Sequence, residues 1–286
     1  MKAARFEYRR AGSLAEALTL LAQSDGAAKA MAGGQSLGPM LNLRLARPAI
    51  VVDVSGVPEL RTVTVDGTGL QVGAGVTHAE IEDGVFGPLR GHPLQRVASG
   101  IAYRAIRNRG TVGGSLAHAD PASDLPSVML VLDATFNLRS KRGKRSVRAR
   151  EFFQGPFATA LAEDEMLIDI VLPATPKGAG SAYVSQVQAA SGYALAGAAV
   201  VVARTRKTVS HAALALTGVG DVSLLVASAD QLVGTKGEPE VLGRVAAGSV
   251  EGIEITGDIH ASAEYRRHLA TVIVRRALQK ALERAS

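Results

Sequence analysis

Two glycine-rich tracts constrain what this chain can fold into more than any other feature of its sequence. Residues 32–36 read Ala-Gly-Gly-Gln-Ser and residues 111–115 read Thr-Val-Gly-Gly-Ser. Paired glycines allow the backbone to approach a ligand closely, and consecutive peptide N–H groups there can converge on an anion. Neither tract has the Gly-Lys-Ser/Thr of a P-loop or the Gly-x-Gly-x-x-Gly of a Rossmann crossover. Together they therefore predict a site for the two phosphates of a dinucleotide in some other fold.

Either tract taken alone is more often a simple turn, because glycine makes up 31 of the 286 residues. The second tract, however, continues into Leu-Ala-His-Ala-Asp-Pro-Ala-Ser-Asp over residues 116–124. With these three motifs, in this order and at this spacing, the chain resembles the FAD-binding medium subunit of molybdenum hydroxylases. That family includes carbon monoxide dehydrogenases, xanthine dehydrogenases and N-heteroaromatic hydroxylases. The resemblance covers nearly the whole chain, from Phe6 to the C-terminal helix.

The resemblance implies an α+β fold. Residues 1–175 are expected to form a PCMH-type FAD-binding domain, with a small α/β unit at about 1–55 and a larger α+β unit at 56–175. Residues 177–286 are expected to form a C-terminal domain like that of the carbon monoxide dehydrogenase flavoprotein, in which helices back a three-stranded sheet.

The resemblance also implies the cofactor site. Main-chain N–H groups of residues 33–36 and 111–115 are expected to hold the pyrophosphate, and Asp124 matches an aspartate that binds a cofactor hydroxyl. Ile101 and Leu167 match apolar lining positions, although core packing is the commoner role of such residues. Tyr193 aligns with an aromatic residue beside the isoalloxazine ring. The complete expected set is Ala32, Gly33, Gly34, Gln35, Ser36, Leu37, Ile101, Thr111, Val112, Gly113, Gly114, Ser115, Asp124, Leu167 and Tyr193.

Asp124 and Tyr193 each have a plainer interpretation, as a helix cap and as a half-buried interface residue. The sequence also departs from the family pattern near Tyr193. Many relatives have an aspartate where this chain has Gly192, and residues 184–190 are uncharged. These departures leave the flavin potential and the electron acceptor open.

The chain offers no convincing nucleophile or acid–base pair, so the expected chemistry is that of the cofactor. By resemblance, a large subunit with the molybdenum cofactor oxidises the substrate, and a small subunit relays electrons through 2Fe-2S clusters. FAD on this chain then passes the electrons to an external acceptor, in a dimer of heterotrimers. Two alternatives are a self-sufficient flavin oxidase or reductase, and a non-catalytic basic scaffold that binds a partner or nucleic acid.

Composition agrees with this interpretation. The chain contains no cysteine, which excludes a cysteine-ligated iron–sulfur cluster within it. Its six histidines show no metal-binding spacing, so no metal site is expected. No apolar run approaches the ~20 residues of a membrane span. The first residues lack the apolar block of a secretory signal, and a cytoplasmic protein is therefore expected.

The positive net charge is local. The formal net charge is +6, but residues 139–150 contain seven basic residues and no acidic one. The rest of the chain carries 25 basic and 26 acidic residues. A solvated hairpin with Gly143 at its tip is the favoured interpretation, and a docking surface for an acidic partner is the second.

Hydrophobic periodicity predicts the main elements of the N-terminal region. Ser13 and Glu16 suggest a capping box for a helix that ends near residue 25. Thr77 and Glu80 suggest another, and a helix over residues 94–107 is expected to lead into the second tract, which then links that helix to a strand. The expected apolar face of the first helix consists of Leu14, Ala17, Leu18 and Leu21. The expected strands are a short buried strand at 29–32, a strand at 50–54, and a hairpin of 63–65 and 70–72 around the turn 66–69.

The remaining expectations concern the second half of the chain. A buried helix is expected at residues 125–132, and residues 173–178 form a linker. A long helix at 264–283 closes the chain. The expected strands are 135–139, 166–172, 182–187 and 211–216, and residues 194–203 are a run of small residues.

Overall fold

The computed structural model describes residues 2–67, 69–188 and 192–286 of this protein. It divides into two compact units. Unit 1 comprises Met1–His118, Thr135–Phe152 and Thr159–Leu172, and unit 2 comprises Ala119–Ala134, Phe153–Ala158 and Pro173–Ser286. Thr68 of the expected hairpin turn, and residues 189–191 of the segment before Gly192, lie outside the described residues.

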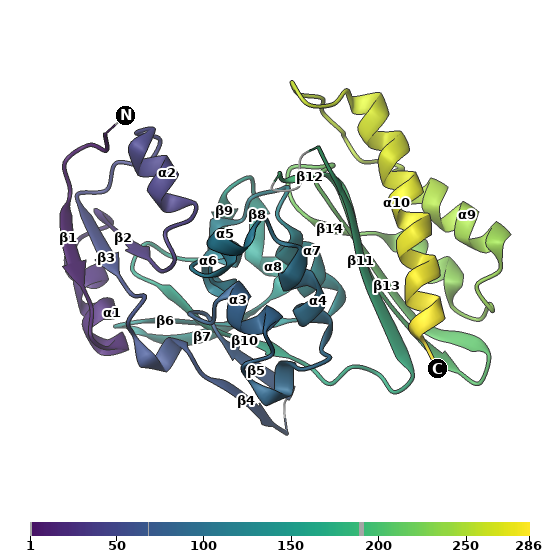
Figure 1. Ribbon diagram of the computed structural model, residues 1–286, viewed down its shortest axis with the longest axis horizontal. Helices are drawn as coiled ribbons and strands as arrows, with labels where there is room; N and C mark the ends of the chain where they lie inside the picture. The colour runs from purple at the N-terminus through teal and green to yellow at the C-terminus, as the bar shows by residue number, and fades with distance from the viewer. Residues whose placement is uncertain (1, 68, 189–191) are drawn as a thin grey trace. The chain divides into compact units, whose positions relative to one another are not determined.

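Unit 1 contains a small parallel sheet and a larger antiparallel one (Figure 1). The strand orders are β1-β3-β2 and β4-β5-β10-β6-β7. The strands are β1 (Glu7–Arg10), β2 (Ala28–Met31), β3 (Ile50–Asp53), β4 (Val63–Asp66), β5 (Gly69–Gly73), β6 (Thr135–Ser140), β7 (Gly143–Arg148) and β10 (Met166–Leu172). The α-helices are α1 (Leu14–Gln23), α2 (Leu37–Asn42), α3 (His78–Glu82), α4 (Pro93–Gly100), α5 (Arg104–Arg107), α6 (Val112–His118) and α8 (Ala149–Phe152).

Helix α1 forms as the sequence predicts. The Ser13 hydroxyl accepts a hydrogen bond from the Glu16 N–H at 3.2 Å, while the Glu16 carboxylate accepts from Gly12 N–H at 2.8 Å rather than closing a full capping box. The four residues of the expected apolar face are all buried, in one cluster with Val52 of the central strand β3. Burying this face is what holds the helix to the small sheet.

The expected short strand after α1 is present, but it is not buried. Lys29 and Ala30 of β2 are exposed, and only Ala28 is fully buried. The physical reason is topology, because β2 is an edge strand paired only with β3 in this sheet. A four-residue pattern cannot distinguish an edge strand from a central one.

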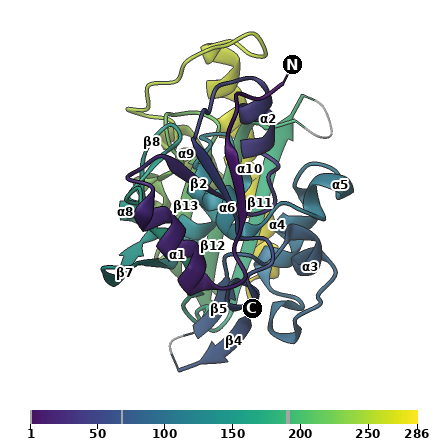
Figure 2. The same cartoon turned by 90° about the vertical axis from the view of Figure 1, so that its left-hand side faces the viewer.

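The larger sheet is built around β10, which pairs with β5 on one side and β6 on the other. Figure 2 shows the β4–β5 hairpin at one end of this unit. Phe136 and Phe152 are fully buried and pack edge to face, with ring centroids 4.6 Å apart. These aromatic rings anchor the β6–β7 hairpin to the core of unit 1.

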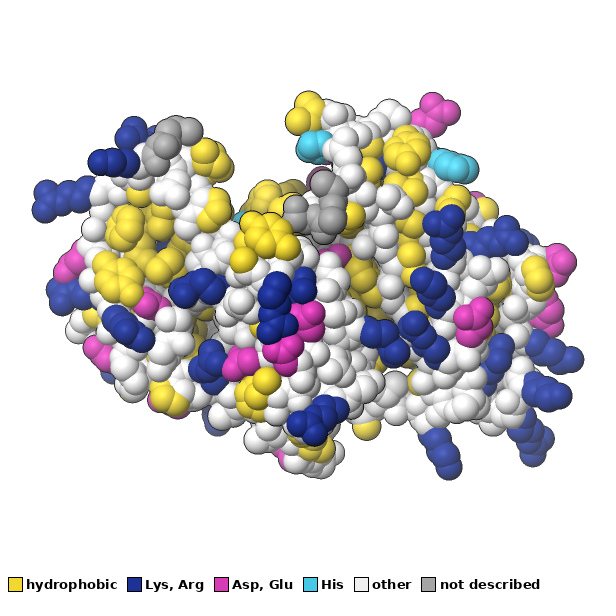
Figure 3. All heavy atoms as spheres, viewed as in Figure 1, with side chains coloured by type: hydrophobic (Ala, Val, Ile, Leu, Met, Phe, Trp, Pro, Cys, Tyr) yellow, Lys and Arg dark blue, Asp and Glu magenta, His cyan; other side chains and the backbone are white. Residues whose placement is uncertain are grey.

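The basic segment forms a hairpin, as expected, with Ser140 and Gly143 paired at its tip. Arg142 donates to Asp164 at 2.6 Å, and Arg145 donates to Glu165 at 2.8 and 2.6 Å. On the face seen in Figure 3, basic side chains are spread over the surface with acidic ones among them. The hairpin is therefore partly neutralised by its own unit, which supports the solvated interpretation.

The prediction of one continuous helix over residues 94–107 is wrong at residues 101–103. Helix α4 ends at Gly100 and α5 begins at Arg104, and between them Ala102 has a φ of +45°. A left-handed residue breaks the helical hydrogen-bond pattern, and alanine adopts it only where surrounding contacts impose it. Composition gives no sign of such a break.

Unit 2 is an antiparallel sheet of order β11-β12-β13-β14 with helices against it. Its strands are β11 (Ala179–Val187), β12 (Ala194–Thr205), β13 (Thr208–Thr217) and the short β14 (Leu224–Leu225). Its α-helices are α7 (Asp124–Val131), α9 (Pro239–Gly248) and α10 (Ala263–Arg284). The short strands β8 (Phe153–Gly155) and β9 (Ala158–Thr159) pair with each other. The sequence pattern predicted β11 and β13, and the family resemblance a three-stranded sheet; the run of small residues at 194–203 forms β12, and the two-residue β14 adds a fourth strand.

Helix α10 lies along the long strands of unit 2 (Figure 1). Small residues allow this close approach: a Cβ atom on Gly180 would lie 2.0 Å from the Ala281 carbonyl oxygen. Ala198 and Val200 of β12 share one buried cluster with Ile273 and Ala277 of α10. The run of small residues in β12 is thus explained by packing. No helix in the described part of the chain is long and apolar enough to cross a membrane.

Candidate functional site

The two glycine-rich tracts of unit 1 come together. A Cβ atom on Gly33 would lie 1.8 Å from the Arg109 carbonyl oxygen and 2.9 Å from the Gly110 nitrogen. The Arg109 Nε also donates to the Gly33 carbonyl at 3.4 Å. The first tract therefore lies directly against the residues that enter the second, and only glycine fits at position 33.

The first tract opens a helix. The Gly34 carbonyl accepts from Gly38 N–H at 2.9 Å, and the Ser36 carbonyl accepts from Met40 N–H at 3.1 Å. The first N–H groups of a helix have no acceptor within it, so those near residues 34–37 are presented outward. Gly34 has a φ of +70°, and Gln35 bonds back to the Gly33 carbonyl at 2.9 Å. The tract is thus a fixed turn with bare main chain.

The second tract is not a link from a helix to a strand, because most of it lies in the first turn of α6. Its N–H groups already have partners: Val112 donates to Val76 O at 3.0 Å, and Gly113 donates to Ala74 O at 2.9 Å. Ser115 N–H donates to the Thr111 carbonyl and Gly114 N–H to the Thr111 hydroxyl, both at 3.0 Å.

Close packing explains Gly113. A Cβ atom there would lie 2.3 Å from the Cβ atom of Ala74. Gly113 is buried, whereas Gly114 is exposed and faces the Thr111 hydroxyl. The two glycines of this pair therefore have different tasks, one in packing and one on the surface of the site.

A pocket of about 220 Å³ lies where the two tracts meet. Its walls come from the first tract, the end of β3, the segment before α3, and the segment between α5 and α6. Its lining residues are Ala32, Gly33, Ser55, Arg61, Gly75, Thr77, Asn108, Arg109 and Thr111. Thr77 and Thr111 face each other as an isolated β-bridge and join two of the walls.

The sequence pointed to only three of these lining residues: Ala32, Gly33 and Thr111. Ser55 and Arg61 come from segments distant from either tract, and only the fold places them here. Two others had a detectable signal. Thr77 closes the predicted capping box with Glu80, as the structure confirms, and Arg109 lies two residues before the second tract.

The pocket contains two guanidinium groups. Arg61 is paired with the Glu80 carboxylate, whereas Arg109 donates to the Gly33 carbonyl. Cationic groups beside outward N–H groups make a favourable environment for a phosphate anion. Among the described residues, no group of three or more His, Asp or Glu side chains is arranged to hold a metal ion.

Ile101 and Leu167 both belong to unit 1. Ile101 is half-buried, and its carbonyl accepts a hydrogen bond from Arg107. Leu167 lies within β10, where its side chain is 6% exposed. This burial is what core packing requires, and a contact with a cofactor stays a prediction for both residues.

Asp124 and Tyr193 belong to unit 2. Asp124 is the first residue of α7, after the N-cap Ser123, and its carboxylate accepts a hydrogen bond from the Tyr183 hydroxyl. Burial raises the pKa of the Asp124 carboxyl, although the Tyr183 hydrogen bond opposes this change. Tyr193 is 56% exposed just before β12.

His78, beneath the second tract, makes the fold sensitive to acid. Its side chain is 3% exposed, and its Nδ1 has no hydrogen-bond partner among the described residues. Burial, with a smaller contribution from the positive charge of Arg107, lowers its pKa to about 4, against 6.5 without these effects. His92, whose Nδ1 accepts from Leu94 N–H, has its pKa lowered to about 4 by burial.

We therefore expect the free energy of unfolding to be fully retained above pH 6.5 and to decrease as the pH falls toward 4. As the pH falls, each histidine is protonated at a higher pH in the unfolded state than in the folded state. This difference lowers the free energy of unfolding by about 3 kcal/mol per group at pH 4. Urea unfolding at a series of pH values checks this. His78→Gln should reduce the slope between pH 6.5 and 4. An equal slope in the natural protein and the variant would contradict the assignment.

Comparison with known proteins identifies relatives over the whole chain. Residues 4–175 match the family described as the FAD binding domain in molybdopterin dehydrogenase. Residues 181–281 match the family described as the CO dehydrogenase flavoprotein C-terminal domain.

Individual relatives agree with these two families. The chain is 35% identical to the carbon monoxide dehydrogenase medium chain of Hydrogenophaga pseudoflava, over 99% of both chains. It is 36% identical to the nicotine 6-hydroxylase medium subunit of Paenarthrobacter nicotinovorans, over 98% of this chain and 99% of that subunit. Among solved structures, carbon monoxide dehydrogenase from H. pseudoflava matches with a TM-score of 0.96 at 35% identity, over all of both chains. Quinoline 2-oxidoreductase from Pseudomonas putida 86 matches with a TM-score of 0.93 at 35% identity, over 99% of both chains.

Proposed function

Because this chain belongs to the family of FAD binding domains in molybdopterin dehydrogenases, we propose that it transfers electrons within a multi-subunit molybdenum hydroxylase. It is the FAD-binding subunit of such an oxidoreductase. The observation that carries the proposal is the meeting of two glycine-rich tracts at one pocket, in a chain that matches medium subunits over its full length.

The residues present fit a dinucleotide. Gly33 lets the first tract lie directly against the Arg109 main chain, and Gly34 allows the turn at a φ of +70°. The N–H groups near residues 34–37 would hold the diphosphate. The hydroxyls of Ser36, Thr111 and Ser115 and the Arg109 guanidinium would complete its surroundings. The bound flavin would supply the redox chemistry, because it accepts and releases electrons singly or in pairs.

The remaining site residues keep their predicted tasks as part of the proposal. In unit 2, Asp124 would bind a cofactor hydroxyl, for which an ionised carboxylate is a suitable acceptor. Tyr193 would cover the isoalloxazine ring, and Ile101 and Leu167 would contribute apolar contacts. Ala32, Leu37 and Val112 would shape the two tracts, Gly113 would let the second tract pack against Ala74, and Gly114 would let the cofactor approach the second tract.

Partners supply the other redox centres in this proposal. The chain contains no cysteine, so 2Fe-2S clusters belong to a small subunit and the molybdenum cofactor to a large one. The relatives described as a carbon monoxide dehydrogenase medium chain and a nicotine 6-hydroxylase medium subunit support such a division of labour. A dimer of heterotrimers, a cytoplasmic location and an external electron acceptor stay predictions.

Two substitutions test the function. Gly34→Asp and Gly114→Asp are each expected to lower the flavin content of the purified protein at least tenfold, because they place charge and bulk beside the phosphates. The flavin-to-protein ratio, measured from visible absorbance after gel filtration, checks this.

Gly91→Asp is the matched control for Gly34→Asp. Gly91 has a φ of +75°, close to the +70° of Gly34, and no other heavy atom lies within 4 Å of its would-be Cβ. It should therefore suffer the same backbone strain and keep its flavin. Normal flavin content in both tract variants would reject the proposed site.

A further inference from the structure

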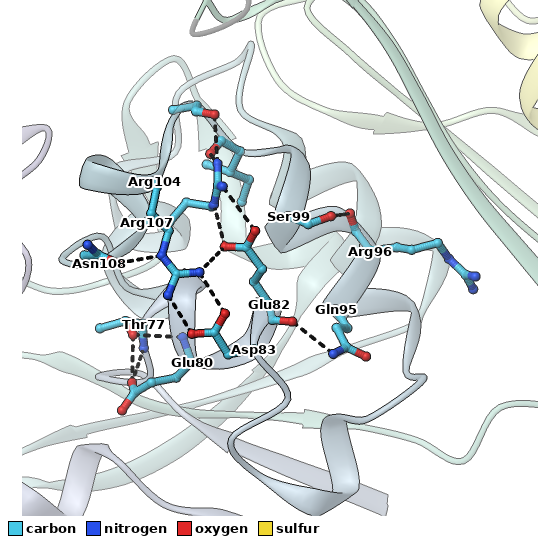
Figure 4. A network of polar contacts seen from close by, with 12 residues as sticks. Thr77, Glu80, Glu82, Asp83, Gln95, Arg96, Ser99, Arg104, Arg107 and Asn108 are labelled. Carbon is cyan, nitrogen blue, oxygen red and sulfur yellow. Dashed lines mark hydrogen bonds and ion pairs between the residues drawn. The ribbon is translucent and has the colours of Figure 1, made fainter.

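Arg107 joins two segments that lead into the pocket. Its Nε and Nη2 donate to the Glu82 carboxylate at 2.8 and 3.1 Å (Figure 4). Its Nη1 donates to the carbonyls of Ile101 and Ala102 at 3.0 and 2.9 Å. The Arg107 side chain is only 12% exposed, so these contacts are shielded from solvent. A planar guanidinium is required to satisfy a carboxylate and two carbonyls at once.

The two segments are continuous with the pocket walls. Helix α3 follows the lining residue Thr77 and ends at Glu82, while α5 ends at Arg107 and continues into the lining residue Asn108. Near the pocket they are joined by a hydrogen bond from His78 N–H to the Gly110 carbonyl at 2.9 Å. The Glu82–Arg107 ion pair joins the last residue of α3 to the last residue of α5. Arg107 therefore ties the wall that begins at Asn108 to α3 at a second point.

The same side chain holds the strained corner between α4 and α5. Ala102 has a φ of +45°, which is unfavourable for a residue with a Cβ atom. Both carbonyls at this corner accept from Arg107 Nη1. Without the Arg107 Nη1 donor, the backbone at Ile101 and Ala102 can relax. Ile101 and the pocket wall from Asn108 to Thr111 can then shift.

Arg104 lies one helical turn from Arg107 and offers a natural comparison. It donates to Asp83 at 2.7 and 2.6 Å, to Glu82 at 2.9 Å and to Asn108 Oδ1 at 2.8 Å. It is 48% exposed, however, and these hydrogen bonds go to side chains rather than to the carbonyls of the corner. Exposed ion pairs contribute little to stability.

We propose that Arg107 is a positioning residue for the flavin, acting through the Ile101–Ala102 corner and the pocket wall from Asn108 to Thr111. The inference rests on the proposed function, because it concerns how that site is kept in shape. Lysine at this position would keep the positive charge but not the fork that reaches Glu82 and two carbonyls together.

The test compares Arg107→Lys with Arg104→Lys in the full chain, purified with its partner subunits. The flavin is removed and rebound, and FAD affinity is measured by the change in flavin fluorescence. Arg107→Lys is expected to bind FAD about tenfold or more weakly, the size expected from losing hydrogen bonds of this kind. The visible flavin spectrum of the bound form should also change, because the ring's surroundings move. Arg104→Lys should stay within about twofold of the natural protein and keep its spectrum.

Several outcomes are distinguishable. Equal FAD affinity and equal spectra for the two variants would overturn the proposal. So would a lower melting temperature of the flavin-free Arg107→Lys protein with unchanged FAD affinity and spectrum, because that describes a purely structural residue. If Arg107→Lys does not fold, Glu82→Gln replaces it, with weaker FAD binding and a changed spectrum expected and no change overturning the proposal. Failure of the natural protein itself to bind FAD would instead reject the proposed function.

Discussion

Gly33→Ala is expected to leave the protein without bound FAD. The added Cβ atom would lie 1.8 Å from the Arg109 carbonyl oxygen and 2.5 Å from its carbonyl carbon, far inside van der Waals contact. Backbone atoms cannot rotate away as the end of a side chain can, so the first tract and the Arg109–Gly110 segment must separate. Separation would open the pocket between them and remove the alignment of the N–H groups.

The measurement is the flavin-to-protein ratio after gel filtration, combined with thermal unfolding of the flavin-free protein. We expect the ratio to fall at least tenfold. Gly38→Ala is the matched control, because Gly38 lies in α2 just after the same tract and no other heavy atom lies within 4 Å of its would-be Cβ. A Gly33→Ala protein with normal flavin content would show that the tracts need not touch.

Gly113→Ala should mainly destabilise the fold. Its Cβ atom would lie 2.3 Å from Ala74 Cβ and 2.7 Å from the Ala74 carbonyl oxygen, where α6 packs against the segment after β5. Overpacking of this kind costs about 3 kcal/mol or more, because α6 must move off its neighbour. The same movement would break the hydrogen bond from Gly113 N–H to Ala74 O.

Gly114→Ala is the comparison for Gly113→Ala. It also replaces a glycine of this tract, but at a position that is not packed against Ala74. The nearest atom to its would-be Cβ is the Thr111 hydroxyl at 2.9 Å, which is the end of a side chain. We expect a change of less than about 1 kcal/mol in the free energy of unfolding, since alanine also favours a helix. Urea unfolding of both variants is the measurement. Equal destabilisation by the two substitutions would contradict the separate tasks assigned to the two glycines.

Much of the fold could be predicted from the sequence where one pattern decides one element. The apolar face of α1 and the buried helix after residue 124 follow from hydrophobic periodicity alone. Gly143 at the β6–β7 turn, and Gly67 and Gly69 at the β4–β5 turn, mark hairpins that the structure contains. The capping box at Thr77 and Glu80 is complete in the structure.

The features that could not be predicted depend on contacts between distant segments. The break at Ala102 is hydrogen-bonded to Arg107, whose carboxylate partner Glu82 lies in another helix. The second tract begins a helix because its N–H groups meet the carbonyls of Ala74 and Val76. No local pattern in residues 94–115 indicates the contacts of Arg107 or those of the second tract with Ala74 and Val76.

The candidate site could be predicted from the sequence only in part, for the same reason. Glycine tracts can be found in a sequence because only glycine allows such close approach. Ser55 and Arg61 reach the same pocket from segments with no motif of their own. A family resemblance supplied the identity of the ligand, and the structure supplied the contact between the tracts.

The central claim is that the two tracts together hold the diphosphate of FAD. Isothermal titration of the flavin-free protein with FAD and, separately, with FMN tests it most directly, because FMN carries the same ring system but a single phosphate. We expect one FAD per chain and at least a hundredfold weaker binding of FMN. Equal affinity for the two flavins would contradict the claim, because the diphosphate would then contribute nothing to binding.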